Sequence, residues 1–325
     1  MKVLLQILKW LGIVLGSLIV IIVILVFARR NRTFDAPFPN IKASTDSAVI
    51  ARGKYLAYGP AHCAGCHCGM ADTAAMFRGE VVDLKGGREF ILPFGVVRTR
   101  NITNDKETGI GRLSDQEIAR TLRYGVGSDG RAIFDFMNFY DASDEDLTAI
   151  ISYLRSTTPV KNSVANHEFN FIGDAIKAFV IKPMGSTTAT RSLSNIPDTT
   201  AKYGEYLANN VANCRGCHTD RDLKTGGYIG EYYSGGFMMP SETDPAFTYV
   251  SRNLTPDKET GHLVNWNFEQ FYNRFHSGAQ TDGSSMPWMM FKQMSENDLK
   301  AIWNYLHTLK PVKKDVGPVR IPTQK

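Results

Sequence analysis

Two five-residue stretches combine two thiols and an imidazole at a spacing suited to covalent attachment and metal binding. They are Cys63-Ala64-Gly65-Cys66-His67 and Cys214-Arg215-Gly216-Cys217-His218. The pattern C-x-x-C-H is the attachment signature of a c-type haem. Two thiols separated by two residues can bond to the two vinyl groups of one porphyrin, and a ring nitrogen of the following histidine can bind the iron. The sequence therefore predicts two covalently attached haem c groups, one held by Cys63, Cys66 and His67 and the other by Cys214, Cys217 and His218.

The second axial ligand of each iron decides whether a haem carries electrons or binds a substrate. A methionine thioether raises the reduction potential and, while it stays bound, leaves no open position. We expect such a methionine well downstream of each motif, on a loop before the last helix. Met137 is the only methionine between residues 76 and 184 and is therefore the candidate in the first copy.

The second copy offers several methionines. We favour Met286, because it lies 68 residues after His218 and Met137 lies 70 residues after His67. Met289 is the alternative, since it has the same six-residue distance to the serine that opens the last helix as Met137 has.

Three further residues lie close to these motifs in the sequence or in a repeated segment. Arg100 and Arg252 each precede an asparagine and can pair with haem propionates, or they are surface charges beside a turn. Cys68 is the fifth cysteine and follows the first motif directly. We expect it to be either a small buried thiol or an exposed reactive one.

The motifs lie inside a longer internal repeat. Gly53-Lys54-Tyr55-Leu56 recurs 151 residues later, and two further blocks, starting at Arg100 and at Ser143, recur 152 residues later. A constant offset across several blocks predicts two copies of one domain.

Each copy is expected to be helical around its motif. A helix at 47–58, and again at 200–209, precedes the motif and carries a glycine that lets another helix cross closely. A capping box opens a helix at Ser114, and the last helix of each copy starts at Ser143 or Ser295 with one apolar face. A further helix at 171–182 is expected to pack on the two domains; the alternative is that it lies on a membrane or a partner subunit.

The amino-terminal segment is strongly apolar. Nineteen residues from Trp10 to Ala28 carry no charge, and as a helix they would span about 28 Å, close to the thickness of a bilayer core. The run is longer than the core of a cleaved signal peptide and lacks a small-residue cleavage site, so we favour an uncleaved anchor. Because haem c is attached outside the cytoplasmic membrane, we expect the residues from about 29 onward to face the periplasm, although the flanking charges do not clearly favour this orientation.

Composition agrees with a packed globular protein. Of the 325 residues, 43% are apolar and 21% are charged. The net charge of +5 comes from residues 1–32, and the rest holds 32 basic and 32 acidic side chains. This balance does not indicate a nucleic-acid partner.

The segments after the first motif resemble a known family. Gly86-Gly87-Arg88-Glu89-Phe90, Asn101-Ile102-Thr103 and the run from Asp105 to Gly111 are similar to cytochrome c subunits of membrane-bound bacterial dehydrogenases, namely the quinoprotein alcohol dehydrogenase and the gluconate or sorbitol dehydrogenase types. The resemblance implies class I cytochrome c domains. Together with the apolar amino-terminal segment and the internal repeat, the expected fold is mostly α, with an N-terminal transmembrane helix followed by two tandem class I cytochrome c domains. The expected boundaries are an anchor at 1–32, domain 1 at 33–160, a linker at 161–199 and domain 2 at 200–325.

The resemblance also implies a function. It implies His/Met ligation by His67 with Met137 and by His218 with Met286, and no substrate turnover by the chain itself. The expected protein is a single-pass dihaem cytochrome of the bacterial inner membrane with periplasmic haem domains. It would pass electrons between a dehydrogenase or quinol-oxidising complex and a downstream oxidase or cytochrome. The alternative is a dihaem redox enzyme, of the peroxidase or thiosulfate-oxidising type, with an open or unusual axial site at one haem.

Overall fold

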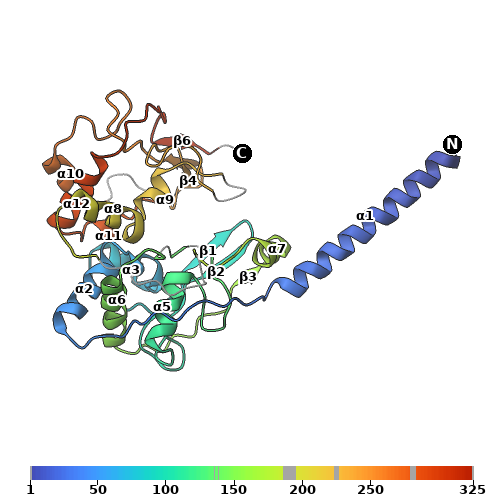
Figure 1. Ribbon diagram of the computed structural model, residues 1–325, viewed down its shortest axis with the longest axis horizontal. Coiled ribbons are helices and arrows are strands. Elements are labelled where there is room, and N and C mark those ends of the chain that lie inside the picture. Colours follow the sequence, from blue (N-terminus) through green and yellow to red (C-terminus); the bar gives the residue numbers. More distant parts are fainter. Residues whose placement is uncertain are drawn as a thin grey trace.

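The computed structural model describes residues 2–134, 136–137, 139–185, 195–222, 227–278 and 283–323. The described chain is mostly helical, with two small three-stranded antiparallel sheets. The amino-terminal helix α1 (Lys2–Arg29) projects away from the rest of the molecule (Figure 1). It begins before the predicted apolar run because the residues preceding Trp10 are also good helix formers. Among the described residues it is the one helix long and apolar enough to cross a membrane.

Most of the remaining elements fall into two repeats with a similar order. The first repeat contains α2 (Ser47–Tyr58), α3 (Cys63–His67), η1 (Met70–Asp72), α4 (Thr73–Phe77), β1 (Glu89–Leu92), β2 (Gly95–Arg98), α5 (Asp115–Tyr124), α6 (Asp144–Ser156) and β3 (Glu168–Phe169). Helix α7 (Phe171–Phe179) follows it. The second repeat contains α8 (Ala201–Tyr206), the π-helical turn η2 (Leu207–Val211), α9 (Cys214–His218), β4 (Met238–Pro240), β5 (Phe247–Val250), α10 (Phe268–His276), α11 (Trp288–Phe291), α12 (Glu296–Leu306) and β6 (Arg320–Pro322). The sheets have the orders β1-β2-β3 and β4-β5-β6.

A close helix crossing forms the centre of each repeat, between α2 and α6 and between α8 and α12. A Cβ atom added to Gly53 would lie 1.8 Å from the carbonyl oxygen of Ala149, and one added to Gly204 would lie 1.9 Å from that of Ala301. Both distances are far shorter than a van der Waals contact, so only glycine permits the crossing. The predicted role of the two glycines is confirmed.

The predicted helix starts are confirmed as well. Ser114 and Glu117 form a reciprocal capping box at the start of α5. Ser143 and Ser295 cap α6 and α12, where their hydroxyls accept hydrogen bonds from the third backbone N–H of the helix. Each cap fixes where the last helix of its repeat begins.

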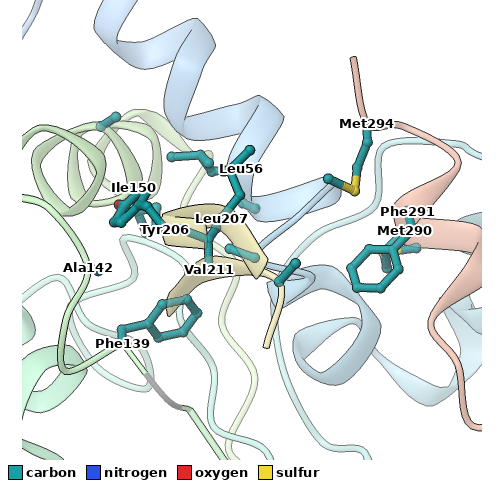
Figure 2. Close-up of a cluster of buried hydrophobic side chains, with 14 of the residues drawn as sticks. Leu56, Phe139, Ala142, Ile150, Tyr206, Leu207, Val211, Met290, Phe291 and Met294 are labelled. Atoms are coloured by element: carbon teal, nitrogen blue, oxygen red, sulfur yellow. The ribbon is translucent and has the colours of Figure 1, made fainter. Parts of the chain in front are cut away.

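The two repeats pack against each other through one continuous apolar core (Figure 2). Leu207 and Val211 of the second repeat lie in the same buried cluster as Leu56 and Phe139 of the first. On the other side of this cluster, Phe291 lies edge-on to the imidazole of His62, with the ring centroids 5.8 Å apart.

Reciprocal hydrogen bonds accompany this core. The Tyr55 hydroxyl donates to Asp298 Oδ2 at 2.6 Å and accepts from the backbone N–H of Ser295 at 2.9 Å. In the opposite direction, the Tyr206 hydroxyl donates to Asp146 Oδ2 at 2.8 Å and accepts from the N–H of Ser143 at 3.0 Å. These residues occupy equivalent repeat positions, so each repeat uses a tyrosine to bind the start of the other repeat's last helix. Burial first, and then the neighbouring carboxylate, raises the pKa of both phenols, which keeps them protonated donors.

Arg52 lies between the two carboxylates of this network. Its Nε is 3.0 Å from Asp146 Oδ1 and its Nη1 is 3.6 Å from Asp298 Oδ2. Its Nη2 donates to the hydroxyl of Tyr203 at 2.9 Å. One guanidinium therefore compensates two buried carboxylates, one from each repeat.

Candidate haem sites

Each C-x-x-C-H motif forms one short helix, α3 or α9, so that its two cysteines lie three residues apart on one face. The residue before each helix has a left-handed backbone, with φ 42° at His62 and 51° at Asn213. Histidine and asparagine adopt this conformation more readily than most residues. The chain therefore enters both motifs through the same sharp bend.

The thiols of both motifs are free and half-buried. Burial raises the pKa of Cys63 and that of Cys214 to about 12, and it also raises the pKa of Cys66 and Cys217. The thiols are therefore protonated at neutral pH, and no disulfide joins them. Two adjacent free thiols at each motif are the donor set that a porphyrin with two vinyl groups requires.

Both motif histidines are held in one orientation. The Nδ1–H of His67 donates to the backbone carbonyl of Arg100 at 2.8 Å, and that of His218 donates to the carbonyl of Arg252 at 2.9 Å. With the proton on Nδ1, the lone pair on Nε2 is available to a metal. Burial lowers the pKa of both imidazoles, which favours the neutral form that binds iron. The histidines therefore fit the role of axial haem ligands.

A hydrogen-bonded frame positions the Arg100 carbonyl. The Asn101 amide donates to the hydroxyl of Thr108 at 3.1 Å and to the carbonyl of Val160 at 2.7 Å, and Asn101 Oδ1 accepts from the N–H of Thr103 at 3.0 Å. Asn101 and Thr103 are almost fully buried, so these bonds replace those that water would make.

The second repeat builds the same frame with the same residue types. Asn253 donates to Thr260 at 3.1 Å and to the carbonyl of Val312 at 2.8 Å, and it accepts from the N–H of Thr255 at 3.0 Å. Sequence reasoning assigned no role to these asparagines and threonines. Their repetition with a constant offset of 152 residues was the signal that could have identified them.

The side chains of the two predicted propionate partners bind backbone. The Arg100 guanidinium donates to the carbonyls of Val164 and Ala165, at 3.4 and 3.2 Å, and the Arg252 guanidinium donates to Gly317 at 2.6 Å. An arginine has five N–H donors, so these bonds leave others for an anion.

Two arginines to which sequence reasoning assigned no role contact the motif helices directly. Arg88 Nη1 donates to the carbonyl of Gly65 at 2.6 Å, and Arg221 Nε donates to that of Gly216 at 3.0 Å. Each brings a positive charge close to the second cysteine of its motif, where it acts against the effect of burial on the thiol pKa. They do not occupy equivalent repeat positions, so repetition could not have revealed them.

All three candidate methionines, Met137, Met286 and Met289, are half-buried and pack against the apolar core. The two repeats can be aligned at these methionines from the residues that follow them. Ser143 and Ser295 cap equivalent helices, and Phe139 and Phe291, which are 6% and 2% exposed, lie at the same distance before these caps.

By this register, Met137 is equivalent to Met289, and the equivalent of Met286 is Phe134. The ring of Phe134 stacks on that of Phe94, with the ring centroids 5.2 Å apart. Met137 and Met286, the two predicted sixth ligands, therefore occupy non-equivalent positions in the two repeats.

Cys68 is fully buried at the end of the first motif. Burial raises the pKa of its thiol above the ordinary value. Of the two roles expected for Cys68, the structure places it as the small buried thiol.

Comparison with known proteins gives relatives that belong to dehydrogenases. The chain is 25% identical over 310 residues to the cytochrome c subunit of alcohol dehydrogenase (quinone) from Gluconacetobacter polyoxogenes, covering 89% of the chain and 64% of the relative. It is 24% identical over 284 residues to the gluconate 2-dehydrogenase cytochrome c subunit from Pantoea cypripedii, covering 81% and 60%. It is also 24% identical over 288 residues to the fructose dehydrogenase cytochrome subunit from Gluconobacter japonicus, covering 85% and 55%.

The chain thus spans less than two thirds of the length of each of these relatives. No protein-family model matches it. Over most of its own length, and at modest identity, the chain is a homologue of the cytochrome c subunits of quinone-linked alcohol dehydrogenase and of gluconate and fructose dehydrogenases.

Proposed function

We propose that the chain is a membrane-anchored, dihaem c-type cytochrome that transfers electrons from a dehydrogenase subunit to the respiratory chain. Downstream, the acceptor would be an oxidase or another cytochrome. The relatives are cytochrome subunits of dehydrogenases, which supports an electron-transfer role without catalysis by the chain itself. The bound haems would supply one-electron oxidation and reduction.

The observation that carries this proposal is the matched pair of bonds from His67 Nδ1 and His218 Nδ1 to backbone carbonyls. A histidine that is fixed through Nδ1 presents Nε2 in a constant direction, which is what a permanent metal ligand needs. We assign Cys63 and Cys66 as the attachment residues of the first haem, and Cys214 and Cys217 as those of the second. Each repeat would then form a class I cytochrome c domain.

On the opposite side of each iron we assign Met137 to the first haem and Met286 to the second, with Met289 as the alternative to Met286. We assign Arg100 and Arg252 to the haem propionates, because each guanidinium extends from the residue whose carbonyl holds the axial histidine. The bonds that each side chain makes to backbone would hold it there.

We propose that α1 anchors the chain in the bacterial inner membrane and that both repeats lie in the periplasm. The helix is long and apolar enough to span a bilayer, and Val26 is its only buried residue among those described. Haem c attachment on the outer side of the membrane requires this orientation.

One observation favours a second candidate function, a dihaem redox enzyme of the peroxidase or thiosulfate-oxidising type. The first repeat has Phe134 at the position of Met286, so its iron would depend on a methionine three residues further along the chain. If Met137 does not bind, the first haem would have an open axial position.

Spectroscopy of the purified protein distinguishes the two functions. For a carrier, both oxidised haems show the charge-transfer band of methionine–iron(III) ligation, and carbon monoxide does not bind before unfolding. High-spin bands from one haem, together with rapid carbon monoxide binding, would favour the enzyme. Isolation in a mild detergent tests the partner: a dehydrogenase subunit should co-purify, and its substrate should reduce both haems. A cytochrome that purifies alone and stays oxidised would contradict the proposed partner.

A further inference from the structure

Helix α7 lies beside the end of α1 from which that helix leaves the rest of the molecule (Figure 1). Three arginines that follow the apolar part of α1 all bind α7 or the residues directly after it. Arg30 forms a 2.8 Å ion pair with Asp174, Arg29 Nε donates to the carbonyl of Ala178 at 3.5 Å, and Arg32 Nη2 donates to that of Ile181 at 2.5 Å. These contacts hold α7 level with the end of the predicted span.

The connection between α1 and the first repeat is short and is held by backbone hydrogen bonds. Thr33 forms a β-bridge with Arg131, and the N–H of Phe34 donates to the carbonyl of Gly130 at 2.8 Å. The first repeat, α7 and α1 are therefore joined within a few residues of the point where the apolar run ends. Because of this, the depth of α1 in a bilayer also sets the depth of α7.

The two faces of α7 differ in chemistry. Gly173 and Ala178 are buried, and a Cβ atom on Gly173 would lie 2.3 Å from the carbonyl oxygen of Phe94. The outer face is apolar and exposed. Its members and their exposed fractions are Phe171 (45%), Ile172 (60%), Phe179 (44%) and, at the cap directly after the helix, Val180 (58%).

Basic side chains border this apolar face. The Arg29 guanidinium lies over the ring of Phe179, 5.5 Å from its centroid, and Lys182 is exposed just beyond the helix. An apolar face with a basic border, at the level where a span ends, has the chemistry of a helix that lies in the headgroup region of an anionic bilayer. A face that points to water would instead be expected to carry polar side chains.

We propose that α7 is an interfacial helix whose outer face, formed by Phe171, Ile172, Phe179 and Val180, inserts into the surface of the bilayer that α1 spans. This contact gives the first repeat a fixed orientation on the membrane in addition to a tether. The proposal depends on α1 being a membrane span, which is part of the proposed function, and its occupant is lipid rather than another subunit.

The test measures the accessibility of spin labels on the full-length holoprotein in nanodiscs of phosphatidylethanolamine and phosphatidylglycerol. Single labels are placed by the substitutions Ile172→Cys on α7 and Val180→Cys directly after it. Leu15→Cys reports on α1, and Ile196→Cys, at a residue that is 78% exposed and lies outside α7, is the matched control in water. The unsubstituted protein gives the background, since Cys68 is buried and the other cysteines are assigned to haem.

Collisions between the spin label and oxygen are frequent in lipid, because oxygen partitions into the bilayer. Collisions with a water-soluble nickel chelate are frequent only where the label faces water. We expect the oxygen-to-nickel ratio at residues 172 and 180 to be several-fold higher than at residue 196 and to approach that at residue 15. A ratio at 172 and 180 equal to that at 196, with residue 15 in lipid, would overturn the surface contact but leave the anchor intact. Labels at 172 and 180 shielded from both reagents would mean that protein covers α7, which also overturns the proposal. A label at residue 15 that faces water would refute the anchor, and the surface contact with it.

Discussion

Replacing Arg52 with methionine should weaken the packing of the two repeats against each other. Arg52 is the cation that faces both Asp146 and Asp298, which are 5% and 3% exposed. Removing one partner of a buried ion pair typically costs about 3–5 kcal/mol, because a charge is left uncompensated. The Arg52 side chain is 23% exposed, so water can enter in its place. The hydrogen bonds from Tyr55 to Asp298 and from Tyr206 to Asp146 also remain. We therefore expect Arg52→Met to lower the free energy of unfolding by about 3 kcal/mol, near the lower end of that range.

The sign of the pH dependence follows from Asp298, whose pKa is raised by burial. A carboxyl group with a raised pKa stabilises the fold when it is protonated, and this contribution is lost as the pH rises through its pKa in the folded state. Without Arg52 the ionised form loses a nearby cation, so its pKa rises further. The difference in stability between wild type and Arg52→Met should therefore be largest at neutral pH and should shrink as the pH is lowered.

The assay is thermal unfolding of the holoprotein in detergent, followed by far-ultraviolet circular dichroism. With an unfolding entropy of about 2.1 cal/mol/K per residue, a loss of about 3 kcal/mol corresponds to a decrease in Tm of about 4–5 °C for this chain of 325 residues. The exposed Arg112 provides the matched control, Arg112→Met. Adding Asp298→Asn to Arg52→Met should restore part of the loss, because it removes one uncompensated charge. Equal Tm values for Arg52→Met and Arg112→Met at neutral pH would refute this interpretation of the interface.

Three further predictions concern the axial ligand, the helix crossing and acid stability. Met286→Leu should lower the reduction potential of one haem while Met289→Leu leaves both unchanged, and redox titration showing the reverse would transfer the ligand role to Met289. Gly53→Ala should cost several kcal/mol by forcing α2 from α6, whereas Gly12→Ala, where nothing lies within 4 Å, should leave Tm unchanged; equal Tm values would contradict the close crossing. Burial first, and then nearby cations, lowers the pKa of His167 to about 4. The neutral imidazole therefore contributes its full stability at pH values above the ordinary histidine pKa of about 6.5, and this contribution is lost as the pH falls toward 4. His167→Gln should reduce the loss of stability across that pH range by about 1–2 kcal/mol, and unfolding curves with the wild-type pH dependence would rule this out.

Features with a local cause could be predicted from the sequence. The helix at 47–58 is observed with those bounds, and the caps at Ser114, Ser143 and Ser295 need only neighbouring residues to form. Gly53 could be interpreted because only a glycine explains so close a crossing. The motif cysteines and histidines were recognisable from their spacing alone.

Features that depend on distant contacts could not be predicted. Tyr55 and Asp298 are 243 residues apart, and nothing in the sequence next to either shows that they share a hydrogen bond. The second copy of the first helix ends as α8 at Tyr206 and continues as a π-helical turn, which no residue preference indicates. The Arg100 carbonyl was missed as the partner of His67 because every residue has a carbonyl, and only the fold selects one.

The most direct test of the central claim is the mass of the denatured chain, because only covalently attached haem survives denaturation. The full-length protein should carry two haem groups, and a Cys63→Ala/Cys66→Ala variant should carry one. A denatured wild-type chain that carries one haem or none would contradict the account of two haem sites.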